Sequence, residues 1–129
     1  MKYLIDSDFL YALFKPDDSN HKKAEAIFKK VENDYLVILN LVVQECTTLV
    51  SKRIDMDNAR KFYESLQMIQ NEIIRINTED EVQAWKIFLK QTKKGTSFID
   101  CANLEVCEKY KLDGILSFDD FYPQSVKIA

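Results

Sequence analysis

Short apolar runs alternate along this chain with longer segments in which apolar residues recur every three or four positions. The short runs are rich in β-branched and aromatic side chains, which predicts strands, and the periodic segments predict helices. The predicted strands cover residues 2–5, 35–39, 73–76, 115–118 and, more weakly, 126–128. The periodic segments are residues 24–31, 62–69 and 82–89. Apolar strands that alternate with helices indicate an α/β fold with a parallel sheet covered on both faces.

Helix-start signals agree with these assignments. Asp57 precedes one periodic segment, while Thr78 stands three residues before Glu81 and Ser97 three residues before Asp100, which is the spacing of a capping box. A further helix is expected in "NLVVQECTTLV", directly after the second predicted strand.

The composition is that of one folded domain spanning residues 1–129, with 47% hydrophobic and 30% charged residues. The longest apolar runs are about four or five residues, far short of the ~20 needed to cross a bilayer. The N-terminal segment reaches Asp6 before a signal-peptide stretch of about 7–15 apolar residues could form. We therefore expect a cytoplasmic protein.

Cysteine, histidine and net charge exclude several kinds of site. Cys46, Cys101 and Cys107 form no CxxC pair, so they are expected to be small buried residues rather than disulfide or zinc ligands. His21 is the single histidine and has no second one with which to share a metal. A net charge of −3 creates no global basic field, so binding of nucleic acid would need local lysines and arginines or metal ions.

Four acids occupy positions where function is expected. Asp6 follows the first predicted strand and Asp119 follows "ILSF", so both leave carboxyl ends of strands, where ligands bind in open parallel sheets. Glu45 lies in a strongly apolar helix, and Asp100 lies in the first turn of the helix "SFIDCANLEVCEKY". Acids gathered in one crevice repel each other unless a cation neutralises them.

The donor set predicts the cation and its chemistry. Carboxylate oxygens without clustered histidines or cysteines favour Mg²⁺ or Mn²⁺ over zinc or copper. Such an ion polarises a phosphate and activates water, which indicates metal-dependent hydrolysis of a phosphodiester.

Each acid also has a structural interpretation. Asp6 and Asp119 could be turn or N-cap residues, and Asp100 could be the third position of a capping box. Glu45 is the hardest to explain structurally, because charged residues are seldom placed amid apolar ones without a partner. Several neighbours could orient the acids or hold water, although solvent exposure, capping or backbone bonding would explain each of them equally well: Ser7, Asp8, Asn103, Ser117 and Asp120.

Taken together, "YLIDSDFLYALFKPDD", "NLVVQECTTLV" and "SFIDCANLEVCEKYKLDGILSFDDFY" resemble a PIN domain, most closely the toxin nucleases of the VapC type. The resemblance runs from residue 3 to about residue 122. It implies a three-layer α/β/α domain with strand order 3-2-1-4-5 and a Mg²⁺- or Mn²⁺-dependent ribonuclease. It also implies a homodimer held inactive by a small antitoxin.

Carried over by motif, the resemblance implies a set of metal-site acids, with Ser117 matching a family Thr or Ser. The acids are Asp6, Glu45, Asp100 and Asp119. Asp8 departs from the family, which often has Asn there, and leaves open whether this residue joins the metal shell. Three aromatic residues are candidates for a dimer face as well as for the core: Phe62, Tyr63 and Trp85. Several basic residues are candidates for RNA binding and equally for ordinary solvated surface positions: Lys15, Lys22, Lys23, Lys52, Arg53, Lys93 and Lys94.

Other functions remain open from the sequence. Some PIN relatives act in RNA maturation, and some PIN-like modules bind RNA or protein without cutting. "DSD" also resembles the DxD motif of haloacid-dehalogenase-like phosphatases, but Leu10 stands where those enzymes usually have Thr or Val. A phospho-acceptor receiver domain fits least, because Asp80 is not placed directly at the end of the third predicted strand.

Overall fold

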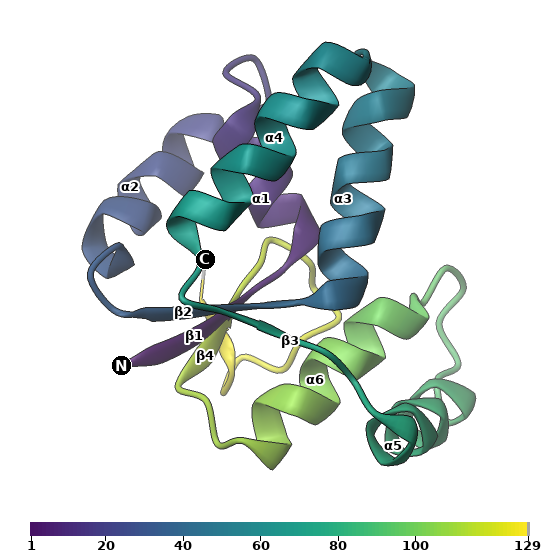
Figure 1. The fold of residues 1–129 in the computed structure, drawn as a ribbon. Helices are drawn as coiled ribbons and strands as arrows, with labels where there is room; N and C mark the ends of the chain where they lie inside the picture. Colours follow the sequence, from purple (N-terminus) through teal and green to yellow (C-terminus); the bar gives the residue numbers. More distant parts are fainter. Residues whose placement is uncertain (129) are drawn as a thin grey trace.

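Five parallel strands form one sheet in the order β3-β2-β1-β4-β5 in a computed structural model that describes residues 1–128 (Figure 1). The strands are β1 (Lys2–Ile5), β2 (Tyr35–Leu39), β3 (Glu72–Ile74), β4 (Gly114–Leu116) and β5 (Lys127–Ile128). The predicted class and strand order are confirmed. The two N-terminal strands have the predicted bounds, and the other three differ from prediction by one or two residues at their ends.

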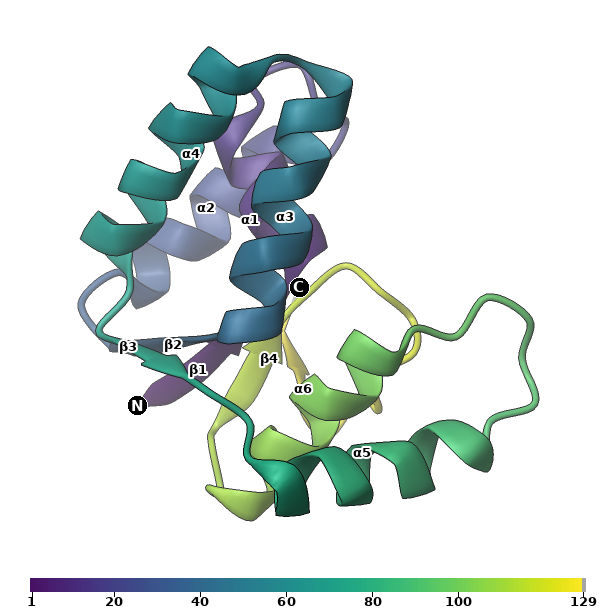
Figure 2. The ribbon, with the colours of Figure 1, turned by 45° about the vertical axis from the view of Figure 1, so that its right-hand side comes forward.

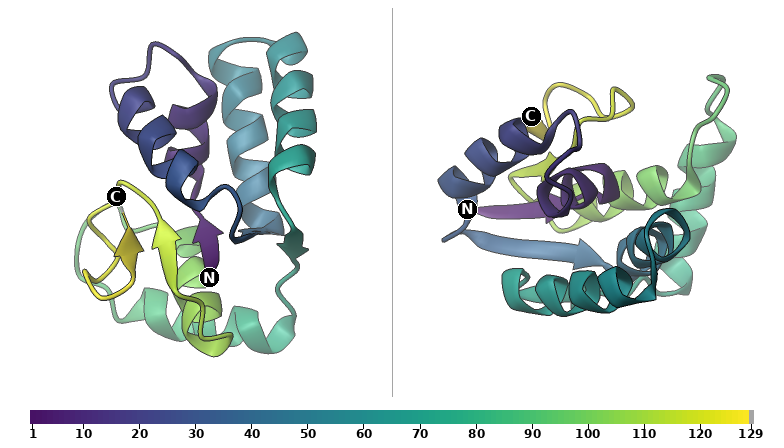
Figure 3. Two further views of the ribbon diagram at one scale, coloured as in Figure 1. Left: turned by 90° about the vertical axis from the view of Figure 1, so that its left-hand side faces the viewer. Right: turned by 90° about the horizontal axis from the view of Figure 1, so that it is seen from above.

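In the described part of the chain, six helices cover the two faces of this sheet. They are α1 (Ser7–Phe14), α2 (His21–Val31), α3 (Asn40–Arg53), α4 (Met56–Ile69), α5 (Thr78–Leu89) and α6 (Phe98–Lys109). Figure 2 shows α1 to α4 on one side and α5 and α6 on the other. The left view of Figure 3 shows the same three layers, with the purple-to-teal helices above the arrows and the green helices below them.

The core lies between the sheet and these layers because β1, β2 and β4 carry apolar side chains on both faces. Leu4, Ile5, Ile38 and Ile115 are fully buried. Burial of such aliphatic side chains contributes roughly 1.5–3 kcal/mol each. Within residues 1–128, no helix combines the length and apolar character needed to span a membrane.

Helix starts differ in detail from those predicted. Residues 7–14 form α1, which the sequence reading did not assign. The cap of α4 is Asp55, whose carboxylate accepts from the Asn58 amide at 2.7 Å, so the prediction of Asp57 was wrong. The capping box of α5 consists of Asn77 and Asp80 rather than Thr78 and Glu81. These shifts arise because several neighbouring polar residues can cap a helix, and tertiary packing selects one.

The apolar stripe of α5 faces outward only in part, because Phe88 is half-buried and the ring of Trp85 lies 4.4 Å from that of Phe98 on α6. Val82, Trp85 and Leu89 are 46%, 43% and 75% exposed, while Asp80 and Ala84 are buried on the opposite face. Phe62, which was a candidate for a dimer face, is 1% exposed and belongs to the core. Of the two places expected for Phe62, the dimer face and the core, the structure shows the core.

Strand order places the carboxyl ends of β1 and β4 next to each other. Ile5 pairs with Leu116 in the parallel register, and the Asp6 amide donates to the Leu116 carbonyl at 3.0 Å. The residues that follow the two strands therefore enter the same crevice.

Candidate active site

Asp6 lies at the centre of the carboxyl edge of the sheet and is only 2% exposed. It caps α1, and its Oδ1 accepts from the Ser7 amide at 2.8 Å and from Asn103 Nδ2 at 3.1 Å. Its Oδ2 lies 2.9 Å from the hydroxyl of Ser117. Burial, followed by the carboxylate of Asp8, raises the pKa of Asp6 to about 7. Asp6 therefore caps a helix and also lies in the crevice, so the two interpretations of this residue are compatible.

Asp8 is fixed in the wall of the same crevice. Its Oδ1 lies 3.2 Å from the Ser117 hydroxyl, and its Oδ2 accepts from the Phe118 amide at 3.1 Å. Ser117 is fully buried and has a single O–H, so it can donate to Asp6 or Asp8 but not to both at once. Burial raises the pKa of Asp8, and the charge of Asp119 raises it further.

Asp100 joins Asp6 through a chain of two buried side chains. The hydroxyl of Tyr122 donates to Asp100 Oδ1 at 3.1 Å and accepts from Asn103 Nδ2 at 3.0 Å, and the same amide group donates to Asp6. Burial, followed by the charges of Asp6 and Asp119, raises the pKa of Asp100 to about 8. The side chain of Asp100 therefore serves this network, and the capping of α6 comes from Ser97, whose hydroxyl accepts from the Ile99 amide at 3.1 Å.

Glu45 reaches the crevice from the middle of α3. The Ser7 hydroxyl donates to its Oε1 at 3.3 Å, while its Oε2 is buried and has no hydrogen-bond partner. An unpaired buried carboxylate oxygen is costly. This atom therefore indicates that a donor or a cation completes the site.

Asp119 and Asp120 have different surroundings although they are neighbours. Asp119 Oδ1 accepts from the Phe121 amide at 2.9 Å, and its own amide donates to the Ser117 hydroxyl at 3.0 Å. Asp120 has a side chain that is 88% exposed and pairs with Lys127 at 3.2 Å. The crevice therefore includes Asp119, while Asp120 is exposed at its edge and borders the hollow that Asp100 and Asp119 also line.

A hollow of about 270 Å³ opens beside Asp100 and Asp119. Lys93 and Lys94, in the loop between α5 and α6, also line it and are exposed. Cations so close to an acidic crevice are suited to binding the phosphates of a polyanion.

Two observations indicate that the four predicted acids suit a hard divalent cation. Burial and mutual repulsion raise the pKa of Asp6 and Asp100, and Glu45 has an unpaired buried oxygen. Each observation describes negative charge that lacks compensation. Within residues 1–128, no three acidic, imidazole or thiol side chains already stand close enough together to hold a metal ion. The chain thus brings the donors to one crevice without holding them in a closed coordination shell.

His21 and the three cysteines have structural roles. His21 Nδ1 lies 2.7 Å from the Ala12 carbonyl and its Nε2 lies 3.2 Å from Glu25, which ties α2 to the end of α1. The three cysteines are buried, and burial raises the pKa of each thiol, which suits packing rather than reactivity.

Tyr122 is the member of the site that the sequence reading missed. It is 2% exposed and lies in the loop after β4, outside any periodic pattern that would mark it as buried. Its position three residues after Asp119 was the available signal, because a residue so close to a strand-end acid has a high chance of facing the same crevice.

Comparison with protein families finds one matching model, that of the PIN domain, over residues 3–124. No curated protein matches the sequence significantly.

Solved structures give further similarities. The sarcin–ricin-loop-cleaving toxin VapC20 of Mycobacterium tuberculosis has a TM-score of 0.82 at 20% identity, covering 92% of this chain and 91% of that one. VapBC2 from Rickettsia felis, bound to a promoter DNA fragment, has a TM-score of 0.71 at 13% identity, with 99% and 98% covered. PAE2754 from Pyrobaculum aerophilum has a TM-score of 0.66 at 20% identity, with 98% and 83% covered. These likenesses agree with the observed strand order and layers.

Proposed function

The chain belongs to the PIN-domain family, and we propose that it is an endoribonuclease that hydrolyses RNA phosphodiester bonds with the help of Mg²⁺ or Mn²⁺. The proposed metal ligands are Asp6, Glu45, Asp100 and Asp119. Membership of this family sets aside the phosphatase and receiver-domain alternatives.

One observation carries the proposal: acids from four separate parts of the chain, of which Asp6 is buried and Glu45, Asp100 and Asp119 are half-buried, face one crevice without enough positive charge to balance them. The raised pKa of Asp6 and of Asp100 and the unpaired oxygen of Glu45 all support a site built to receive a cation. When bound, such an ion polarises a phosphate and lowers the pKa of water.

The side chains of this chain would do the positioning. Ser117 and Asn103 hold the two oxygens of Asp6, and Tyr122 holds Asp100, so the acids keep a defined spacing. Lys93 and Lys94 would bind the phosphates that flank the scissile bond. Asp8, held by the Phe118 amide, would add negative charge at the mouth of the crevice.

We further propose that the ribonuclease is the toxin of a toxin–antitoxin pair, acts on cytoplasmic RNA and forms a homodimer. The likeness to VapC20 and to VapBC2 supports the first part. The exposed stripe of Val82, Trp85 and Leu89 on α5 supports a dimer, because an apolar helix face of this kind is usually covered.

The direct test is incubation of the purified chain with cellular RNA in Mg²⁺, in Mn²⁺ and in a chelator. We expect discrete cleavage products with either ion and none with the chelator, because the acids alone cannot activate water. Equal cleavage in the chelator would contradict the metal-dependent mechanism, and no cleavage under any condition would favour a non-catalytic module.

Tyr122→Phe is expected to weaken Mn²⁺ binding about tenfold, because second-shell partners of metal ligands typically contribute 10–100-fold to affinity. The phenol has a pKa raised by burial, so it stays protonated and donates to Asp100 at neutral pH. Titration calorimetry with Mn²⁺ would measure the change. Tyr110→Phe, on an exposed residue of the same type, is the matched control. Unchanged Mn²⁺ affinity in Tyr122→Phe would remove Tyr122 from the site.

A further inference from the structure

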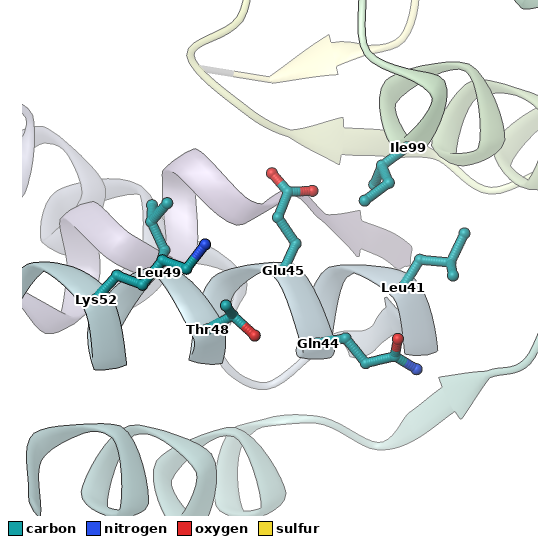
Figure 4. A pocket seen from close by; sticks show the side chains of 7 residues that line it. All are labelled: Leu41, Gln44, Glu45, Thr48, Leu49, Lys52 and Ile99. Atoms are coloured by element: carbon teal, nitrogen blue, oxygen red, sulfur yellow. The ribbon is translucent and has the colours of Figure 1, made fainter. Parts of the chain in front are cut away.

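Two carboxylate oxygens of residues 1–128 are buried without a hydrogen-bond partner. One is Glu45 Oε2, and Figure 4 shows this side chain rising from α3 toward the side on which Ile99 of α6 lies, where the proposed cation would supply a partner. The other is Glu105 Oε2, in the later turns of α6. Glu105 is 8% exposed and lies away from the acidic crevice, so its unpaired oxygen needs a separate explanation.

Asp80 faces Glu105 across the contact between α5 and α6. Asp80 is 2% exposed and forms the capping box of α5 with Asn77, whose amide donates to Asp80 Oδ2 at 3.1 Å. Its Oδ1 accepts from Lys109 Nζ at 2.6 Å. The carboxyl groups of Asp80 and Glu105 are themselves in hydrogen-bonding contact. Asp80, Glu105 and Lys109 therefore connect the start of α5 to the end of α6, and we call them the α5–α6 latch.

The two carboxyl groups of the latch can share one proton. An ionised carboxylate only accepts hydrogen bonds, so two of them in contact repel, whereas a proton on one joins the pair. Although burial acts in the opposite direction, hydrogen bonds from Lys109 and from the Asn77 amide lower the pKa of Asp80. Burial, followed by the charge of Asp80, raises the pKa of Glu105. The shared proton therefore belongs to Glu105.

The other charged side chains near this contact are exposed. They come from α5 and α6, while β4, which packs beside α6, carries no charged residue. They are Glu79, Lys86, Lys90 and Glu108. Several of them line an open hollow of about 460 Å³, so water surrounds their charges. Because water screens exposed charges, the buried pair of Asp80 and Glu105 dominates the response of this contact to pH.

We propose that the α5–α6 latch is sensitive to pH: the proton shared by Asp80 and Glu105 holds the start of α5 on α6, and its loss releases the first turns of α5. The other end of the helix has a different attachment, because the ring of Trp85 lies 4.4 Å from that of Phe98. The released turns include Val82, where the exposed apolar stripe of α5 begins. The latch contains none of the proposed metal ligands, so it stands whether or not the chain cuts RNA.

The direction of the effect follows from the proton on Glu105. The pKa of this carboxyl is about 7 with the latch closed and near 4.5 when it is exposed to water. Its contribution to closure is therefore complete below pH 4.5 and is lost as pH rises through 7. Asp80, with a lowered pKa, and Lys109, with a raised one, stay charged across this range. From pH 6 to pH 8.5 we expect the equilibrium constant for opening to rise about tenfold and to level off above pH 7.

Amide hydrogen exchange of the full chain, followed by mass spectrometry at pH 6 and pH 8.5, tests the latch. Exchange is expressed as protection relative to the intrinsic rate at each pH. Glu105→Gln carries an amide that can donate to Asp80 at either pH, so it should keep the latch closed. Glu64→Gln, the same change at an exposed position of α4, is the matched control. As pH rises, we expect the first turns of α5 to lose about tenfold more protection in the unmodified chain and in the control than in Glu105→Gln.

Other outcomes would contradict the proposal. An equal loss of protection in Glu105→Gln and in the unmodified chain would show that Glu105 does not control the docking of α5. If the first turns of α5 are as strongly protected as α4 at pH 8.5, α5 is released only when the whole chain unfolds. Carbon NMR of the Glu105 carboxyl needs no variant. We expect its signal to titrate near pH 7, and a midpoint near 4.5 would rule out the shared proton.

Discussion

Asp6→Asn is expected to cleave RNA about 10³-fold more slowly than the unmodified chain. Near pH 8 and without metal, this variant is also expected to unfold at a higher urea concentration. The loss follows because Asp6 is the most buried of the four proposed ligands. The gain in stability follows because a neutral amide no longer repels the carboxylates of Asp8, Glu45 and Asp100.

The measurements are cleavage rates in Mn²⁺ and urea denaturation in a chelator. Asp57→Asn is the matched control, since it makes the same chemical change at an acid of α4 that is 82% exposed and paired with Arg60. We expect the control to cut RNA at the normal rate. Wild-type activity in Asp6→Asn would overturn the site, and a large loss of stability would show that the variant had damaged the fold instead.

The same pair of variants tests the toxin proposal. Expression of the unmodified chain or of Asp57→Asn in a bacterial host is expected to halt growth, while Asp6→Asn is expected to permit it. Equal growth of all three strains would indicate a ribonuclease without toxin activity, such as an RNA-maturation enzyme.

The central part of the fold could be predicted from the sequence because its strands are apolar on both faces. β1 and β2 have no polar alternation that could place them at a sheet surface, so their bounds were predicted without error. α1 was missed because its eight residues are too few to establish a helical period after a strand of similar apolar character. The outward stripe of α5 was misread because periodicity shows that a helix is amphipathic but not what covers its apolar face.

The residues of the candidate site that follow strands, or that stand out in an apolar helix, could be predicted from the sequence. Asp6 and Asp119 follow strands that the topology makes neighbours of one crevice, and Glu45 was conspicuous in an apolar helix. The hydrogen bonds of Asn103 and Tyr122 depend on how α6 packs beside the loop after β4. That packing is a tertiary property, so local sequence patterns do not predict it.

Metal-free stability is expected to fall as pH rises from about 4 to 8. The pKa of Asp6 is about 7 in the folded chain and near 3.8 when unfolded, so the folded state binds this proton more tightly. Its stabilising effect is complete below pH 4 and is lost as pH rises through 7. The difference corresponds to about 4 kcal/mol for Asp6 alone. Asp100, with a pKa of about 8, acts in the same direction.

Divalent ions are expected to reverse this fall, because a bound cation replaces the protons that the acids lose. At a Mn²⁺ concentration of about 100 times Kd, binding adds about 2.7 kcal/mol to the free energy of unfolding. Glu105 lies away from the crevice, and burial together with the charge of Asp80 raises its pKa to about 7. We expect Mn²⁺ to leave its contribution to the pH dependence of stability unchanged. Urea denaturation at pH 5 and pH 8.5, with and without Mn²⁺, measures both parts. Stability that rises with pH in the chelator, or that Mn²⁺ leaves unchanged at pH 8.5, would show that the buried acids do not form a cation site.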